Sequence, residues 1–198
     1  METNDVIEKV NRLLLKPLGF VRKGALFNRR RGNIVDVVDF PVNKAGDAVT
    51  LEAGVQHDEL YAALWEAPPP RFSNEAACIV HARIDALAEG HETWFALADP
   101  DAPARAVSAM EGPVLRFLQG HHDLAAIDRF LAHATATERA PRSLLYLAIV
   151  RHRRGDAAAA SALLTEVESR ADGDWSQRAA TLGTRLATAA AAAPAPAS

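Results

Sequence analysis

The chain has very little cysteine, few aromatic residues and no long hydrophobic run. Its 198 residues include one cysteine, so no disulfide can form within the chain and no cysteine cluster can hold zinc. No apolar stretch approaches the roughly 20 residues that a membrane-spanning helix needs. The hydrophobic content is 49%, which is enough for a folded core without disulfides or metals.

The N-terminal residues also predict no secretory signal. Its apolar cluster, the three leucines at 13–15, is too short for the core of a signal peptide and is followed by Lys16 and Pro17. The single cysteine, Cys78, stands among apolar neighbours, which favours a buried and unreactive thiol. We therefore expect a cytoplasmic protein that does not associate with a membrane.

Known catalytic and cofactor-binding motifs are missing as well. The sequence contains neither the phosphate-binding patterns GxxxxGK[ST] and GxGxxG nor the nucleophile elbow GxSxG. Asp36, Asp39 and His57 remain as acid–base candidates for an enzyme. Asp36 and Asp39 are three residues apart and face opposite sides of a strand, which makes a shared site awkward. We expect a non-enzymatic protein that has no cofactor.

Histidines invite a metal-site interpretation, and the densest group is His121, His122 and Asp123. Adjacent residues on a helix point about 100° apart, so neighbouring histidines rarely bind the same ion. The HExxH pattern is also missing. The sequence therefore predicts no metal site.

Charge is distributed unevenly along the chain. The net charge is -3, which gives no general attraction to nucleic acid or anionic lipid. Residues 1–31 nevertheless contain eight Lys/Arg against three Asp/Glu, which leaves 14 Lys/Arg against 22 Asp/Glu for the rest. The N-terminal region is therefore basic and the remainder is acidic.

The basic region contains a predicted β-hairpin. Gly32-Asn33 is a turn signal because both residues tolerate positive φ. The flanking strands would cover residues 20–31 and 34–40, and Gly24 would mark a bulge or a close backbone approach. A three-residue loop would shift every cross-strand pair. A two-residue loop predicts these pairs: Arg29 with Asp36 and Phe27 with Val38.

The cationic residues of this hairpin have two interpretations. They can form a binding face for phosphate, nucleic acid or an acidic protein, or they can be solvated charges that protect an edge strand from aggregation. No Tyr or Trp lies between the arginines, so a base-stacking platform is poorly supported. The candidate partner-binding residues are Arg22, Lys23, Arg29, Arg30, Arg31 and Asp36.

The order of the predicted elements gives an α+β fold class. An N-terminal helix precedes an antiparallel sheet of three to four strands, and an all-helical C-terminal part follows. We expect an α+β domain over residues 1–100, a helical subdomain over 101–188 and a disordered Ala/Pro tail over 189–198. Residues 78–87 are compatible with a strand or a helix. The other predicted elements are helices at 3–16, 58–66, 104–119, 123–134, 142–154, 156–170 and 175–188 and a strand at 48–57.

The N-terminal half resembles a known bacterial family. Four features are similar to the domain of unknown function 4304 family. They are the segment LGFxRKGxxFxRRRGxIVDVVxF, a strand ending in Gly54-Val55, and the later pairs Arg83-Ile84 and Trp94-Phe95. The resemblance extends over residues 5–97. The family has no established catalytic residues, so none is transferred. Its members resemble immunity proteins of bacterial toxin systems in size. The matching residues of the first segment are Leu18, Gly19, Phe20, Arg22, Lys23, Gly24, Phe27, Arg29, Arg30, Arg31, Gly32, Ile34, Val35, Asp36, Val37, Val38 and Phe40.

Three functional hypotheses follow from the sequence. The preferred one is a cytoplasmic immunity protein that neutralises a bacterial toxin or effector by protein–protein contact. The second is a nucleic-acid-associated protein that uses the arginine-rich hairpin. The third is an enzyme built on the acid–base candidates. The sequence assigns neither the partner nor the oligomeric state.

Overall fold

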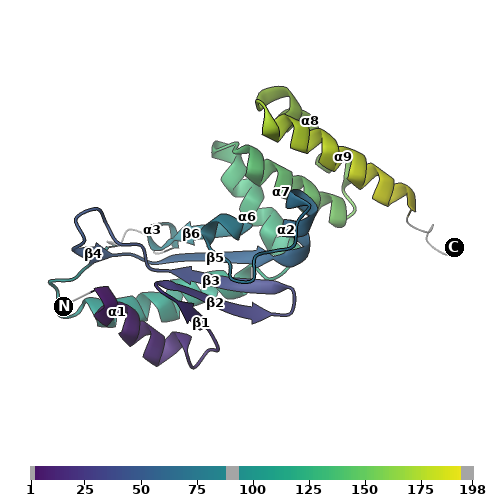
Figure 1. Ribbon diagram of the computed structural model, residues 1–198. Helices are drawn as coiled ribbons and strands as arrows, with labels where there is room; N and C mark the ends of the chain where they lie inside the picture. Colours follow the sequence, from purple (N-terminus) through teal and green to yellow (C-terminus); the bar gives the residue numbers. More distant parts are fainter. Residues whose placement is uncertain (1–2, 88–93, 193–198) are drawn as a thin grey trace. The chain divides into compact units, whose positions relative to one another are not determined.

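A computed structural model describes residues 3–87 and 94–192, and the chain forms two compact units (Figure 1). The first unit contains all the strands and, apart from the segment 59–68, the helices before residue 124, whereas the sequence placed the division near residue 100. The second unit is helical and takes in a short segment from the middle of the chain. The first unit covers residues 1–58 and 69–123, and the second covers 59–68 and 124–198.

The first unit begins with the predicted N-terminal helix. Helix α1, Thr3–Val10, buries Val6 and continues into a π-helical turn, η1, Asn11–Leu15. Gly19 then takes a φ of +84° and its N–H bonds to the carbonyl of Lys16. This is a Schellman-type helix end, which only a residue tolerant of positive φ forms without strain.

Five antiparallel strands follow in the spatial order β1-β2-β3-β5-β6, which confirms the α+β class with more strands than predicted. Gly32 takes a φ of +62° and closes the predicted two-residue turn. Arg29 consequently lies opposite Asp36, so the predicted register is confirmed. The strands are β1 Val21–Lys23, β2 Leu26–Arg31, β3 Ile34–Asp39, β5 Glu52–His57 and β6 Val80–Arg83.

The predicted strand over residues 20–31 is wrong, because the chain reverses in its middle. Gly24 takes a φ of +66° and forms a tight turn with Ala25, so this segment is a hairpin of β1 and β2. The glycine was interpreted as a bulge, but its positive φ at the first turn position permits a complete reversal.

Two other strand predictions also change. The predicted strand at 48–57 is interrupted at Thr50 and Leu51, and its first part, β4, Ala48–Val49, pairs with β7, Phe95–Ala96, in a separate two-stranded sheet. The sequence allowed a strand or a helix over residues 78–87, and the structure contains one of each in this segment. Strand β6 passes directly into helix α3, Ile84–Leu87.

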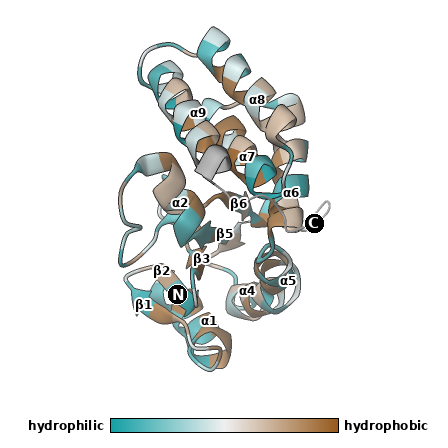
Figure 2. Ribbon diagram, turned by 90° about the vertical axis from the view of Figure 1, so that its right-hand side faces the viewer, coloured by the Kyte–Doolittle hydropathy of each residue, from teal (hydrophilic) through white to brown (hydrophobic). Residues whose placement is uncertain are grey.

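The main sheet has one face against the helical layer. Phe27, Val38 and Ala53 share this face in the register and are buried. The helical layer comprises α1, α4, α5 and the π-helical turn η3, which contains Pro113. Figure 2 shows α1, α4 and α5 together in the lower part of the view. The later elements are α4 Ala102–Ala109, η3 Met110–Val114 and α5 Leu115–Gly120.

The opposite face of the sheet is crossed by residues 69–78, which we call the crossing segment. It ends with a 3-10 turn, η2, Glu75–Ala77, and with the buried Cys78. Cys78 packs with Val35 and Val37 on this face. The segment therefore gives the second face a partial cover.

In the second unit, helices α6 to α9 pack in sequence order, and α2 is held by hydrogen bonds from α9. Asp156 caps α8, because its carboxylate accepts a hydrogen bond of 3.0 Å from the Ala159 N–H. Helix α9 extends to Ala192, so residues 189–192 are helical and not disordered as predicted; residues 193–198 lie outside the described residues. The helices are α2 Asp58–Trp65, α6 Leu124–Thr137, α7 Pro141–Arg153, α8 Ala157–Arg170 and α9 Asp174–Ala192.

In the parts of the chain that the structure describes, no helix combines the length and the apolar character needed to cross a membrane.

Candidate functional site

The five cationic residues of the predicted binding face lie on two different faces of the sheet. Arg22 is paired with Phe27 in the register, and Arg29 with Asp36, so both belong to the face that the helices cover. Lys23 and Arg30 belong to the opposite face, because side chains alternate along a strand. The hairpin arginines therefore do not form one continuous cationic surface.

On the helix-covered face, Asp36 is in contact with two arginines and a histidine. Its side chain is fully buried, and its Oδ2 accepts hydrogen bonds from Arg29 Nε at 2.9 Å and Nη2 at 2.7 Å. Arg31 Nε lies 3.8 Å from the same oxygen. His122 Nε2 lies 2.7 Å from Asp36 Oδ1. Asp36 and Arg29 thus satisfy each other inside the protein, which is what a buried charge requires.

The remaining arginine of this face ties β1 to the N-terminal helix. Arg22 forms an ion pair with Glu8 and donates a hydrogen bond of 3.0 Å to Asn4 Oδ1. It also lies over the ring of Phe27 at 5.6 Å. These contacts give Arg22 a structural role.

The acid–base candidates do not converge on one site. Asp36 and Asp39 face opposite sides of β3, and His57 is buried at the end of β5 opposite Ile34. Burial is the main reason why the pKa of Asp39 is raised. Its cross-strand neighbour Glu52 has a pKa raised to about 7, first by burial and then by the nearby Glu75.

The histidine group is also divided. His121 Nδ1 lies 2.7 Å from the carbonyl oxygen of Phe117, whereas His122 turns to Asp36. Within residues 3–87 and 94–192, no three His, Cys, Asp or Glu side chains are arranged to hold a metal ion.

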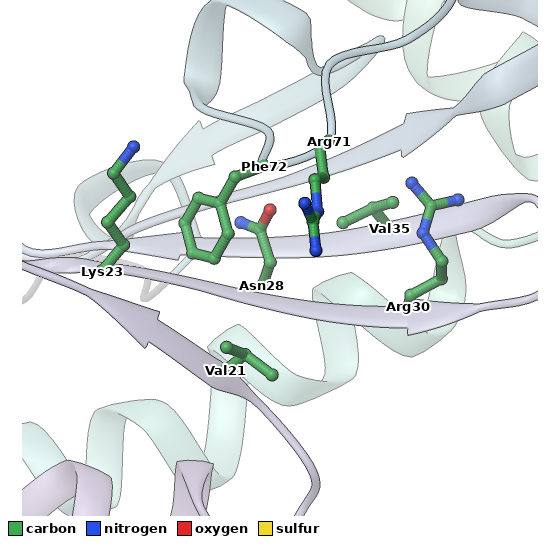
Figure 3. Close-up of a pocket in the computed structure, with 7 residues that line it drawn as sticks. All are labelled: Val21, Lys23, Asn28, Arg30, Val35, Arg71 and Phe72. Carbon is green, nitrogen blue, oxygen red and sulfur yellow. The ribbon is translucent and has the colours of Figure 1, made fainter.

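The other face of the sheet contains a cavity of about 500 Å³, which we call the cationic pocket (Figure 3). Its basic side chains come from two places: Lys23 and Arg30 rise from β1 and β2, and Arg71 descends from the crossing segment. None of the described lining residues is acidic. The pocket is lined by Val21, Lys23, Asn28, Arg30, Val35, Arg71 and Phe72.

Hydrogen bonds to Ser73 hold the crossing segment over the sheet. The Asn28 side chain forms two hydrogen bonds with the Ser73 backbone. Its Nδ2 donates to the Ser73 carbonyl at 2.8 Å, and its Oδ1 accepts from the Ser73 N–H at 2.6 Å. The Ser73 hydroxyl donates to Gln56 Oε1. Ser73 is fully buried, so its neighbours Arg71 and Phe72 are held at the rim of the pocket.

Two of the pocket's three cations have no acidic partner. Arg30 Nη1 lies 2.5 Å from Asp58 Oδ2, so part of its charge is balanced. Lys23 and Arg71 form no ion pair with any residue in the described ranges, and both side chains are exposed. The pocket thus combines two uncompensated positive charges with an apolar surface from Val21, Val35 and Phe72.

Sequence reasoning found Lys23 and Arg30 but missed Arg71 and Phe72. These two residues follow a run of three prolines, Pro68 to Pro70, and belong to no periodic element, so the hydrophobic pattern gives no information about where they lie. The proline run itself indicates a stiff extended chain, but it does not show which surface that chain crosses.

A protein-family model matches the chain. The model described as Domain of unknown function (DUF4304) matches residues 12–115, which is more than half of the chain. The matched region contains the whole main sheet, the crossing segment and all residues of the cationic pocket. No curated protein and no solved structure matches the chain.

Proposed function

The chain belongs to the DUF4304 family, and we propose that it is a non-enzymatic protein that binds an acidic segment of a protein partner in the cationic pocket. The observation that carries the proposal is the pair of uncompensated cations, Lys23 and Arg71, beside an apolar surface. Such a pocket attracts a carboxylate-bearing chain and also accommodates an apolar side chain next to it. Basic groups at the rim increase the association rate with an acidic partner.

The composition of the pocket favours a protein partner over a nucleic acid. Phe72 is the one aromatic residue in the described lining, and base stacking on single strands normally uses several aromatic side chains. Duplex binding relies on many phosphate contacts, whereas this pocket offers two free cations. Nucleic acid is therefore the alternative occupant that the experiment below must distinguish.

The arrangement of the ionisable residues supports binding over catalysis. Asp36, the most buried acid–base candidate, is already hydrogen-bonded by Arg29 and contacted by His122. Asp39 and His57 lie apart from it. A general acid or base must reach a substrate proton, and a carboxylate engaged in this way is better suited to stabilising the hairpin.

The biological setting that we propose is that of a cytoplasmic immunity protein. The family resemblance suggested this role, and the charge distribution supports it, since the acidic remainder of the chain can face a basic toxin surface while the pocket takes an acidic segment. Attraction between opposite charges brings such partners together rapidly and depends on salt concentration.

A copurification experiment with a charge-reversed variant tests the proposal. The tagged chain, the variant Lys23→Glu/Arg71→Glu and the control Lys44→Glu/Arg116→Glu are each exposed to the native cytoplasm at low and high salt. The control reverses two exposed charges outside the pocket. Retained proteins are identified by mass spectrometry and then expressed alone.

The expected result is one stoichiometric protein that is toxic when expressed alone. The wild-type chain and the control retain it, and the pocket variant loses it. Recovery of nucleic acid that is lost at high salt would replace this proposal with the alternative. Equal retention by all three chains would show that the pocket is not the binding site.

A further inference from the structure

The cationic pocket lies next to an open edge of the sheet. Strand β1 is at the end of the strand order, and no other strand in the described ranges pairs with its outer side. Val21 and Lys23 belong to β1 and also line the pocket. A segment that entered the pocket would therefore run beside a strand with unused backbone groups.

Strand β1 also exposes an apolar side chain. Among the described residues, Val21 of β1 is one of four exposed large hydrophobic residues; the others are Leu13, Leu18 and Val42. Val21 is 64% exposed. Soluble proteins usually protect an edge strand with charge or cover, and the exposed Val21 leaves an apolar contact beside Lys23 that a partner can use.

The register shows which backbone groups of β1 are available. Lys23 and Leu26 flank the two-residue turn and exchange hydrogen bonds, and Val21 and Asn28 form the next bonded pair. Arg22, between them, is a non-bonded position of the ladder, so its N–H and C=O point to the outer edge. One residue of β1 thus offers both a donor and an acceptor to an added strand.

We infer that the acidic segment binds as an additional β-strand along the outer edge of β1. This inference rests on the proposed function and specifies how the same site holds its partner. Side chains alternate along the added strand, so every second one lies on the pocket face beside Lys23 and Arg71. Carboxylates at these positions meet uncompensated positive charge, and the main-chain bonds to Arg22 set the register.

This mode of binding makes a prediction that side-chain docking does not make. An added strand needs the N–H of Arg22, whereas a peptide held by charge and apolar contact does not. Proline at position 22 removes that N–H, and the β1–β2 ladder does not use it. Arg22→Ala removes the same side chain, including its contacts with Glu8 and Asn4, but keeps the N–H.

The test compares three chains: wild type, Arg22→Pro and Arg22→Ala. The probe is a fluorescently labelled extended peptide of about six residues, the usual length of a strand, in which glutamate alternates with valine. Binding is measured by fluorescence anisotropy at low salt, and circular dichroism checks that each variant is folded. If Arg22→Pro does not fold, the wild-type chain is titrated with the same peptide N-methylated at alternate residues.

We expect Arg22→Pro to bind the peptide about tenfold more weakly than Arg22→Ala, which corresponds to about 1.4 kcal/mol. N-methylation of the peptide should have a similar effect. Equal affinities of the two variants, or of the two peptides, would overturn strand addition and leave the pocket proposal in place. If the wild-type chain does not bind the unmodified peptide, the proposed function itself is contradicted.

Discussion

At Gly54 the crossing segment approaches the sheet more closely than any side chain at that position permits. A Cβ added to Gly54 would lie 2.5 Å from Cys78 Sγ and 2.8 Å from Cys78 Cβ. Both residues belong to the buried layer between the sheet and the segment. The absence of a side chain at Gly54 therefore allows the segment to lie flat on the sheet.

Replacing Gly54 with alanine should destabilise the first unit. The added methyl group forces Cys78 away from Val35 and Val37, and overpacking of this kind typically costs about 1–3 kcal/mol. Urea unfolding measures the change. Gly120→Ala is the matched control, because nothing lies within 4 Å of a Cβ there. An equal effect at both positions would contradict the close approach.

Removing the Asp36 carboxylate should cost far more than removing a surface carboxylate. Asp36→Asn leaves the buried Arg29 without its counter-charge, and the loss of one partner of a buried pair costs about 3–5 kcal/mol. Glu8→Gln removes the exposed partner of Arg22 and should cost about 1 kcal/mol or less. The free energy of unfolding from urea titration compares the two. Similar losses would show that Asp36 is not the buried anchor described above.

Glu52 should make the protein less stable as the pH rises. Burial and the proximity of Glu75 raise its pKa from 4.5 to about 7, so the folded state binds this proton more tightly than the unfolded state. The free energy of unfolding should therefore fall between about pH 4.5 and pH 7 and level off above that range. Glu52→Gln should remove the contribution of this carboxyl to the pH dependence. The free energy of unfolding of the variant should therefore increase relative to that of the wild type as the pH rises. Parallel melting-temperature curves for the two proteins would contradict the assignment.

At the scale of elements, α9 acts as a structural part of the helical unit. Ala179 and Leu182 are buried, and Arg178 and Arg185 donate hydrogen bonds to the carbonyls of Leu64 and Ala63. These bonds attach α9 to α2, so the short segment from the middle of the chain is held by the end of the chain.

Truncation after Gly173 should consequently destabilise the helical unit. The shortened chain loses α9, exposes the surface of α8 that contacts it and frees the last carbonyls of α2. We expect a lower melting temperature and a loss of helical signal beyond that of the deleted residues. Truncation after Ala192 keeps every described helix and serves as the control. A cooperative transition at the wild-type temperature after both truncations would show that α9 contributes no stability.

The sequence predicted elements well where the determining signal is local. Gly32 and its neighbour specified the turn and hence the pairing of Arg29 with Asp36. Gly24 was misinterpreted because a glycine in a strand-like segment is compatible with a bulge and with a reversal, and only the folded backbone distinguishes them. The helices of the second unit were found because their apolar residues and their ends are visible in the local sequence, although α7 is buried at every position from Leu144 to Val150 and has no single apolar stripe.

The candidate site depends on contacts that local patterns do not contain. Ser73 pairs with Asn28 across 45 residues, and His122 reaches Asp36 across 86. The sequence showed a cluster of hairpin cations, but strand alternation separates them and the crossing segment supplies Arg71 from outside the hairpin. The pocket is therefore a product of tertiary structure.

At the scale of the whole molecule, the charge asymmetry of the sequence is partly balanced by ion pairs. Arg29 and Arg30 of the basic N-terminal region pair with Asp36 and Asp58 of the acidic remainder, and Arg22 pairs with Glu8 inside the basic region. Lys23 and Arg71 form no ion pair within the described residues, and both line the same pocket. The central claim is that these two cations select an acidic protein segment.

The most direct test is the affinity of the alternating glutamate–valine peptide for the pocket variant Lys23→Glu/Arg71→Glu and for the control Lys44→Glu/Arg116→Glu. Anisotropy titrations at about 20 mM and about 200 mM salt show how much of the affinity comes from electrostatic attraction, because salt screens exposed charges. We predict at least a tenfold loss for the pocket variant at low salt, or about 1.4 kcal/mol, little change for the control and a smaller difference at high salt. Equal affinities for both variants at low salt would contradict the assignment of the pocket as the binding site.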